Sequence, residues 1–80
     1  MPKKSKKTYY KDEFFLKEIG EKIRNLRLSK GMTQMELAFA CNDTDYSQIN
    51  RMELGKVNFS VSYLSLISEK LEVAPKDLLP

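Results

Sequence analysis

The sequence contains no histidine and no tryptophan, and its single cysteine is Cys41. Without histidine the chain lacks the commonest metal ligand and the usual general base, and one cysteine can form neither an intrachain disulfide nor a multi-thiolate zinc site. A chain without disulfides is typical of a reducing compartment, so we expect a cytoplasmic protein. No nucleophile–base or carboxylate pair is spaced for catalysis. We therefore predict that the protein is not an enzyme and holds no metal and no cofactor.

Long apolar segments are also missing. No uninterrupted apolar run approaches the roughly 20 residues that a membrane-spanning helix needs. The basic start, residues 1–7, leads into tyrosines, a lysine and an aspartate, which do not form the apolar stretch of a signal peptide. At 80 residues, 41% of them hydrophobic, the chain has room for one small domain and for no separate effector domain. This composition favours a binding module that contacts neither a membrane nor a small-molecule ligand.

The positive charge is concentrated at one end of the chain. Residues 1–30 carry ten Lys/Arg and four Asp/Glu, a charge of +6, whereas residues 31–80 carry four and seven, a charge of −3. The basic end opens with a run of four lysines, Lys3, Lys4, Lys6 and Lys7, with no apolar residue between them. We predict that residues 1–10 form a flexible basic arm. Such an arm could neutralise phosphates or only solubilise the chain, and its composition leaves both interpretations open.

Apolar residues recur at helical spacing and never alternate as in a strand, so we predict an all-α fold. The predicted helices cover residues 11–30, 34–41, 46–53 and 61–71, and a last short helix begins at Pro75 and ends at Leu79. The core-facing positions expected in the first and fourth helices are Phe15, Leu16, Ile19, Ile23 and Leu26, and Val61, Leu64, Ile67 and Leu71. Residues 11–80 are thus expected to form one compact five-helix domain.

Capping residues mark the starts of these helices. Thr33 and Glu36 have the spacing of a capping box, in which the hydroxyl and the carboxylate each accept a hydrogen bond from the other residue's backbone N–H. Asp45 and Gln48 repeat that spacing and are expected to begin the third helix in the same way. Ser60 is expected to cap the fourth helix.

The second and third predicted helices, joined by a short polar turn, have the helix-turn-helix pattern. The third helix has two unlike sides: one carries Tyr46, Ser47, Asn50 and Arg51, and the other carries Ile49 and Met52. Hydroxyl, amide and guanidinium groups are those that hydrogen-bond base edges in a major groove. An ordinary surface helix with a solvated polar face explains the same pattern, and the periodicity alone favours that simpler interpretation.

Several short motifs, read together, resemble the phage-repressor (XRE, Cro/cI-type) helix-turn-helix family. They are Ile19–Arg27, Gly31–Gln34, Leu37–Ala38, Ile49–Lys56 and Leu71–Leu79, and they cover residues 19–79 in the family's order. The resemblance implies a compact five-helix domain of the lambda-repressor type that binds double-stranded DNA. It also implies a sequence-specific transcriptional regulator, a repressor or a controller protein.

The resemblance assigns roles to individual residues. It implies that Gln34 holds a DNA phosphate and braces the recognition helix. It places Tyr46, Ser47 and Arg51 at base-reading positions, with Asn50 between them. It places Lys56 and Asn58 in a loop that follows the sugar-phosphate backbone. Finally, it implies a buried ion pair between Arg27 and Glu53.

The chain departs from the family pattern in three places. It has one residue more than the common spacing, within residues 41–45. Leu54 stands where a polar residue is common, so a phosphate contact is expected to be lost there. Phe59 replaces a frequent proline and is expected to pack under the loop.

The predicted helix-turn-helix is acidic, which hinders its approach to a polyanion. Residues 33–53 contain four acidic side chains and one arginine, a local charge of −3. Pairing of Glu53 with Arg27, the helix N-termini and the lysine arm are expected to offset this charge.

Apolar residues on the far side of the fourth helix and at the C-terminal end predict a self-association surface. Its expected members are Tyr63, Leu66, Leu78 and Leu79. A twofold homodimer built there would present two recognition helices to a palindromic operator. The alternative is a protein-interaction or antitoxin-type subunit with weak or no DNA binding, which the acidic charge of residues 31–80 favours.

Overall fold

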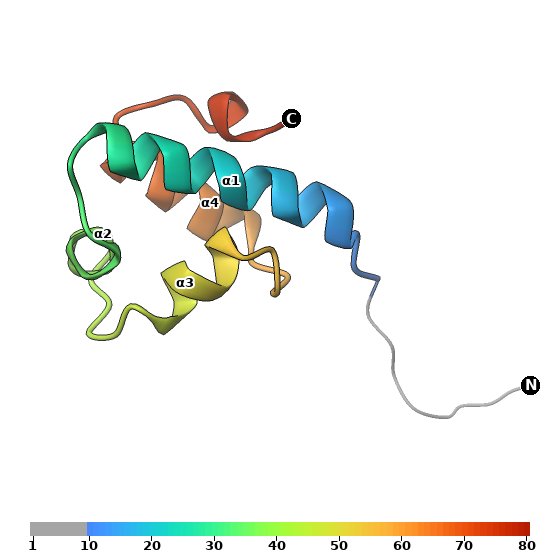
Figure 1. Ribbon diagram of the computed structural model, residues 1–80, viewed down its shortest axis with the longest axis horizontal. Coiled ribbons are helices and arrows are strands. Elements are labelled where there is room, and N and C mark those ends of the chain that lie inside the picture. The colour runs from blue at the N-terminus through green and yellow to red at the C-terminus, as the bar shows by residue number, and fades with distance from the viewer. Residues whose placement is uncertain (1–9) are drawn as a thin grey trace, which may run out of the picture.

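The computed structural model describes residues 10–80 and shows four α-helices followed by one 3₁₀ turn. The elements are α1 (Glu13–Ser29), α2 (Gln34–Ala40), α3 (Ser47–Glu53), α4 (Val61–Lys70) and η1 (Pro75–Leu78) (Figure 1). No strand occurs in this part of the chain. The all-α prediction is confirmed. The predicted count of five helices is corrected, because the last one is a single 3₁₀ turn.

Local hydrogen bonds explain where α1 begins and ends. The Asp12 carboxylate accepts a hydrogen bond from the backbone N–H of Phe15 at 3.0 Å, so the helix begins at Glu13 and not at residue 11. At the other end Gly31 has a φ of +70°, the left-handed conformation that glycine adopts at no steric cost. The chain thereby turns out of α1 and leads into α2.

Two of the three predicted caps are confirmed. Thr33 and Glu36 form the reciprocal capping box of α2, with N···O distances of 3.0 and 2.8 Å. The Ser60 hydroxyl accepts a hydrogen bond from the backbone N–H of Tyr63 at 3.0 Å and begins α4.

The capping box predicted for Asp45 and Gln48 is wrong. Tyr46 is the N-cap of α3, and its side chain makes no capping hydrogen bond. The Asp45 carboxylate instead accepts from the backbone N–H and the hydroxyl of Ser47, at 2.9 and 2.8 Å. This is the short-range bond of an aspartate to the backbone two residues on, which competes with the wider box.

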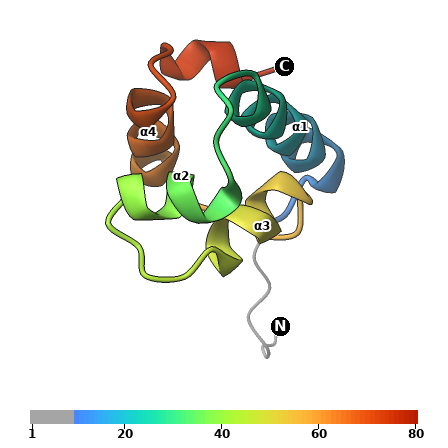
Figure 2. The ribbon, with the colours of Figure 1, turned by 60° about the vertical axis from the view of Figure 1, so that its left-hand side comes forward.

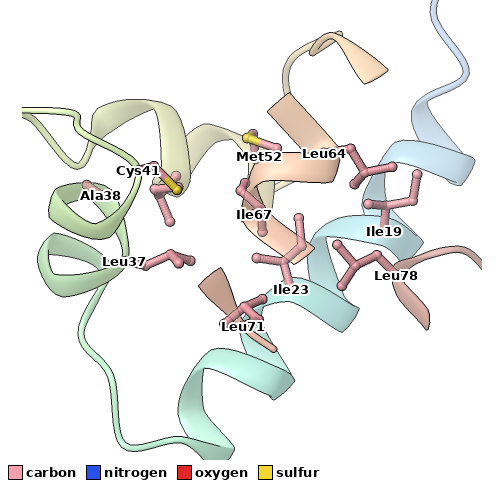
Figure 3. Close-up of a cluster of buried hydrophobic side chains, with 11 residues drawn as sticks. Ile19, Ile23, Leu37, Ala38, Cys41, Met52, Leu64, Ile67, Leu71 and Leu78 are labelled. Carbon is pink, nitrogen blue, oxygen red and sulfur yellow. The ribbon is translucent and has the colours of Figure 1, made fainter. Parts of the chain in front are cut away.

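The core lies where the four helices meet (Figure 3). Its buried side chains are Ile19, Ile23, Leu37, Ala38, Cys41, Ile49, Met52, Leu64, Ile67, Leu71 and Leu78. Two predicted core positions are wrong: Phe15 is 42% exposed and Val61 is 83% exposed. Both occupy the first turn of their helices, and Figure 1 shows the start of α1 extending beyond the other helices. None of the helices in residues 10–80 is long and apolar enough to cross a membrane.

Two glycines bring the backbones of α1 and α3 into contact. A Cβ atom added at Gly20 would collide with the carbonyl oxygen of Met52 and would lie 2.6 Å from that of Glu53. Gly55, whose φ is +72°, places its own missing Cβ 2.6 Å from the Cα of Lys17. The end of α3 therefore lies directly on α1. Figures 1 and 2 show α2 and α3 on one side of α1, with η1 on the other side.

Replacing Gly20 with alanine should therefore destabilise the protein. In an ordinary helix interior the change adds about 1 kcal/mol of stability. Here the new methyl group would push against backbone carbonyls that cannot move independently, and overpacking of this kind costs about 1–3 kcal/mol or more. Urea unfolding monitored by circular dichroism measures the difference. Asn25→Ala, at an exposed position of α1, is the matched control and should change stability little. A Gly20→Ala variant more stable than the wild type would contradict the close approach.

Candidate nucleic-acid interface

The helix-turn-helix of α2 and α3 presents one side of α3 to solvent. Tyr46 is 47% exposed and Arg51 is exposed, while Ser47 and Asn50 are partly buried. The opposite side is closed, because Ile49 and Met52 are completely buried. No other segment of residues 10–80 covers Tyr46 and Arg51. The four side chains proposed to read bases thus lie on one open surface.

Ser47 and Asp45 form a small unit at the start of α3. Because both hydrogens that Ser47 can donate, from its backbone N–H and its hydroxyl, go to Asp45, the hydroxyl oxygen remains available only as an acceptor. The pKa of the Asp45 carboxyl is lowered, mainly by the hydrogen bond from the backbone N–H of Ser47 and next by the bond from its hydroxyl. The ionised carboxylate therefore stabilises the start of α3 fully at any pH above the pKa of an aspartate in the unfolded chain. This stabilisation is lost as the pH falls through the lower pKa that Asp45 has in the folded protein.

Behind α3 the structure places Arg27 and Glu53 in a buried ion pair. Arg27 Nε lies 2.6 Å from Glu53 Oε2, and Arg27 Nη2 lies 3.0 Å from Glu53 Oε1. Both residues are at most 6% exposed. Arg27 Nη1 also donates to the carbonyl oxygen of Met32 at 2.7 Å. The guanidinium therefore joins α1, the loop before α2 and the end of α3.

Gln34 connects this ion pair to the exposed side of α3. Its Nε2 donates to Glu53 Oε1 at 3.0 Å and to Asn50 Oδ1 at 3.3 Å. Both hydrogens of the Gln34 amide are used within the protein, so this residue braces α3. Its implied phosphate contact stays a prediction, and in this arrangement the side-chain donor is not free to make it. Asn50 keeps its NH₂ group for an outside partner.

The loop after α3 is tied to the segment before α1. Lys56 and Asn58 are both exposed in this loop. Asn58 Nδ2 donates to the carbonyl oxygen of Tyr10 at 2.8 Å, and Lys11 Nζ donates to the carbonyl oxygen of Lys56 at 2.9 Å. Sequence reasoning missed Lys11, because its partner lies 45 positions away. The lysines of the predicted arm, Lys3, Lys4, Lys6 and Lys7, lie outside the described residues.

The predicted self-association surface needs one correction. Leu78 is completely buried in the core of its own chain, because the η1 turn packs it against α1 and α4. Tyr63 and Leu66 are partly buried and also pack against this core, and Leu79 is 40% exposed. Three of the four residues thus remain accessible, and Leu78 is removed from the set.

The Tyr63 hydroxyl lies 3.5 Å from Asp43 Oδ2, in the turn between α2 and α3. Burial, with added repulsion from Cys41 and Asp43, raises the pKa of Tyr63 to about 12. The phenol donates this hydrogen bond to Asp43, and the raised pKa extends the pH range over which it can do so. No group of three or more His, Cys, Asp or Glu residues able to hold a metal ion occurs among residues 10–80.

Comparison with known proteins identifies the class. A family model described as helix-turn-helix matches residues 23–78. Because the match covers more than half of the chain, the protein belongs to the helix-turn-helix family of DNA-binding regulators.

Several relatives of this chain are controller proteins. It is 46% identical over 61 residues to the control protein C.BamHI of Bacillus amyloliquefaciens, across 75% of this chain and 74% of that protein. The restriction-modification controller protein C.AhdI of Aeromonas hydrophila has a TM-score of 0.76 at 31% identity, across 80% of this chain and 96% of that one. The controller protein C.Esp1396I was solved as a tetramer with its natural 35 base-pair operator. It has a TM-score of 0.74 at 34% identity, across 84% of this chain and 87% of that one.

Replacing Glu53 with alanine should reduce the free energy of unfolding by about 3–5 kcal/mol, because Arg27 would stay buried without its partner. Thermal or urea unfolding measures the loss. The double variant Arg27→Met with Glu53→Leu should recover much of it, since a buried ion pair can often be exchanged for apolar side chains at little cost. A Glu53→Ala protein as stable as the wild type would show that the pair contributes nothing to the fold.

Proposed function

We propose that the protein is a sequence-specific transcriptional regulator, a repressor or controller, that reads the major groove of DNA with α3 as a homodimer. The observation that supports this most directly is the open polar side of α3, whose opposite side is completely buried. A helix held in this way offers its polar groups from a rigid support, which base recognition requires. Among its relatives are control proteins, and one of them was solved with its operator.

In this proposal Arg51 is the main base-reading residue. A guanidinium forms paired hydrogen bonds with the O6 and N7 atoms of guanine. Tyr46 and Ser47, at the start of α3, contact neighbouring bases, and Ser47 acts there as an acceptor because its hydrogens are used by Asp45. The free NH₂ group of Asn50 donates to a base acceptor while Gln34 holds its oxygen.

Phosphate contacts come from the flanks of the helix-turn-helix. We propose that Lys56 and Asn58 follow the backbone beside α3. Residues 1–10 serve as a basic arm, with Lys3, Lys4, Lys6 and Lys7 adding charge that attracts DNA of any sequence. Residues 11–80 form the DNA-binding domain. The protein would act in the cytoplasm by binding alone, without catalysis, and its concentration and dimerisation would set its occupancy of the operator.

Selection of bound duplexes from a random pool should yield a palindromic consensus, because a twofold dimer reads two identical half-sites. On that consensus, Arg51→Ala should cost about 1–3 kcal/mol in each half-site and relax the preference at one base position there. Binding measured on single-base variants separates this result from a phosphate contact. A uniform loss over all variants would contradict base reading by Arg51, and a pool without enrichment would contradict the proposed function.

The proposed dimer uses the accessible side of α4, with Tyr63, Leu66 and Leu79. Leu66→Glu should shift the protein from dimer to monomer in sedimentation velocity, because a carboxylate would be buried without a partner between the two copies. Val61→Glu is the matched control on the same helix, at a position that is already 83% exposed, and it should leave the dimer intact. Circular dichroism checks that both variants fold. A folded Leu66→Glu protein that remains dimeric would remove this surface.

A further inference from the structure

Three lysines from separate segments meet at the loop after α3. Lys11 precedes α1, Lys17 lies in its first half, and Lys56 follows α3; all three are exposed. Lys11 Nζ lies 2.9 Å from the carbonyl oxygen of Lys56. Gly55, directly before Lys56, lies against the backbone of Lys17, with 2.6 Å between its missing Cβ and the Lys17 Cα. The fold therefore brings together three segments that each carry a lysine, and the first and last of these lysines are 45 positions apart in the sequence.

Hydrogen bonds and the close glycine contact hold this arrangement. Asn58 Nδ2 donates to the carbonyl oxygen of Tyr10, which fixes the chain directly before Lys11. The left-handed backbone of Gly55 turns the loop onto α1. The Lys11 ammonium group donates one of its three hydrogens to the backbone carbonyl oxygen of Lys56, so two remain for another acceptor.

None of the ion pairs within residues 10–80 involves Lys11, Lys17 or Lys56. Glu13 and Glu21 stand one turn to either side of Lys17 on α1, but neither lies within 4.0 Å of its ammonium group. Elsewhere in this part of the chain, Lys30 is paired with Glu72 and Lys70 with Glu69. No ion pair therefore competes with an outside anion for the ammonium groups of Lys11, Lys17 and Lys56.

The lysine cluster lies beside the open side of α3. The loop that carries Lys56 continues directly from the C-terminal end of α3, and Figure 1 shows it beneath the start of α1, on the same side of α1 as α3. A duplex placed against α3 would bring a strand of its backbone next to this loop. The cluster also offsets the charge of −3 on residues 33–53.

We propose that Lys11, Lys17 and Lys56 form a single phosphate-binding cluster that holds the DNA backbone beside the base-reading helix. The proposal rests on the proposed function and extends it from the helix-turn-helix to the first half of α1. Asn58 also positions this cluster, because one of its two amide hydrogens goes to the carbonyl oxygen of Tyr10, and the other stays available for the backbone contact proposed above. The cluster contacts phosphates only, so it adds affinity without adding sequence preference.

The test uses the full chain with Lys11→Ala, with Lys17→Ala and with both changes. Affinity for the selected duplex and for a random-sequence duplex is measured over a series of salt concentrations. Each lysine that neutralises a phosphate contributes about one to the slope of log affinity against log salt concentration. A homodimer carries each lysine twice, so we expect each single variant to reduce the slope by about two and the double variant by about four, and both duplexes to be weakened by the same factor.

Two sets of controls make the result decisive. Lys76→Ala removes the same charge from η1, on the other side of α1 from α3 (Figure 1), and should leave the slope unchanged. Lys11→Arg and Lys17→Arg keep the charge and should keep the slope, while thermal unfolding shows that every variant is folded.

Unchanged slopes in the alanine variants, with wild-type binding still dependent on Arg51, would overturn the cluster alone. Failure of the wild type to bind any duplex at low salt would overturn the proposed function as well.

Discussion

The carboxylate of Glu53 is the point on which the arrangement of the helices depends. Arg27 approaches it from α1 with two nitrogen atoms, and Gln34 approaches it from the start of α2. Arg27 also holds the loop before α2 through Met32. Because a buried charge without its partners is costly, these bonds are formed together or lost together. Three helices are therefore fixed relative to one another by one carboxyl group.

The glycine contacts act on the same helix as the ion pair. Gly20 lets the carbonyl groups of Met52 and Glu53 lie against α1, and Gly55 repeats this close approach at Lys17. A side chain at either position would collide with backbone atoms of the facing segment. The buried side of α3 is thus determined by backbone contact, and its polar side must face away from the molecule. Base readout tolerates little error in position, so this rigidity has a functional consequence.

Features set by neighbouring residues could be predicted from the sequence, and features set by distant contacts could not. Thr33 and Ser60 were identified as caps because a cap acts within three residues. The burial of Leu78 depends on how η1 returns to α1 and α4, which no local pattern specifies. The pairing of Lys11 with Lys56 is equally invisible in the sequence. For the Arg27–Glu53 ion pair, the family resemblance supplies what periodicity alone leaves open, and the base-reading positions that it implies stay a prediction.

The two halves of the chain divide the work of binding DNA according to their charge. The acidic half, residues 31–80, carries the groups suited to distinguish bases, but its charge of −3 opposes approach to a polyanion. Burial of Glu53 against Arg27 removes one of its negative charges from the surface, while the carboxylate of Asp45 stays exposed beside α3. Attraction must then come from the basic half, through α1 and the segment before it. In the proposed function, phosphate contacts carry no sequence information, so discrimination between operators would rest on α3. Affinity could then change through the basic half without any change in the preferred operator.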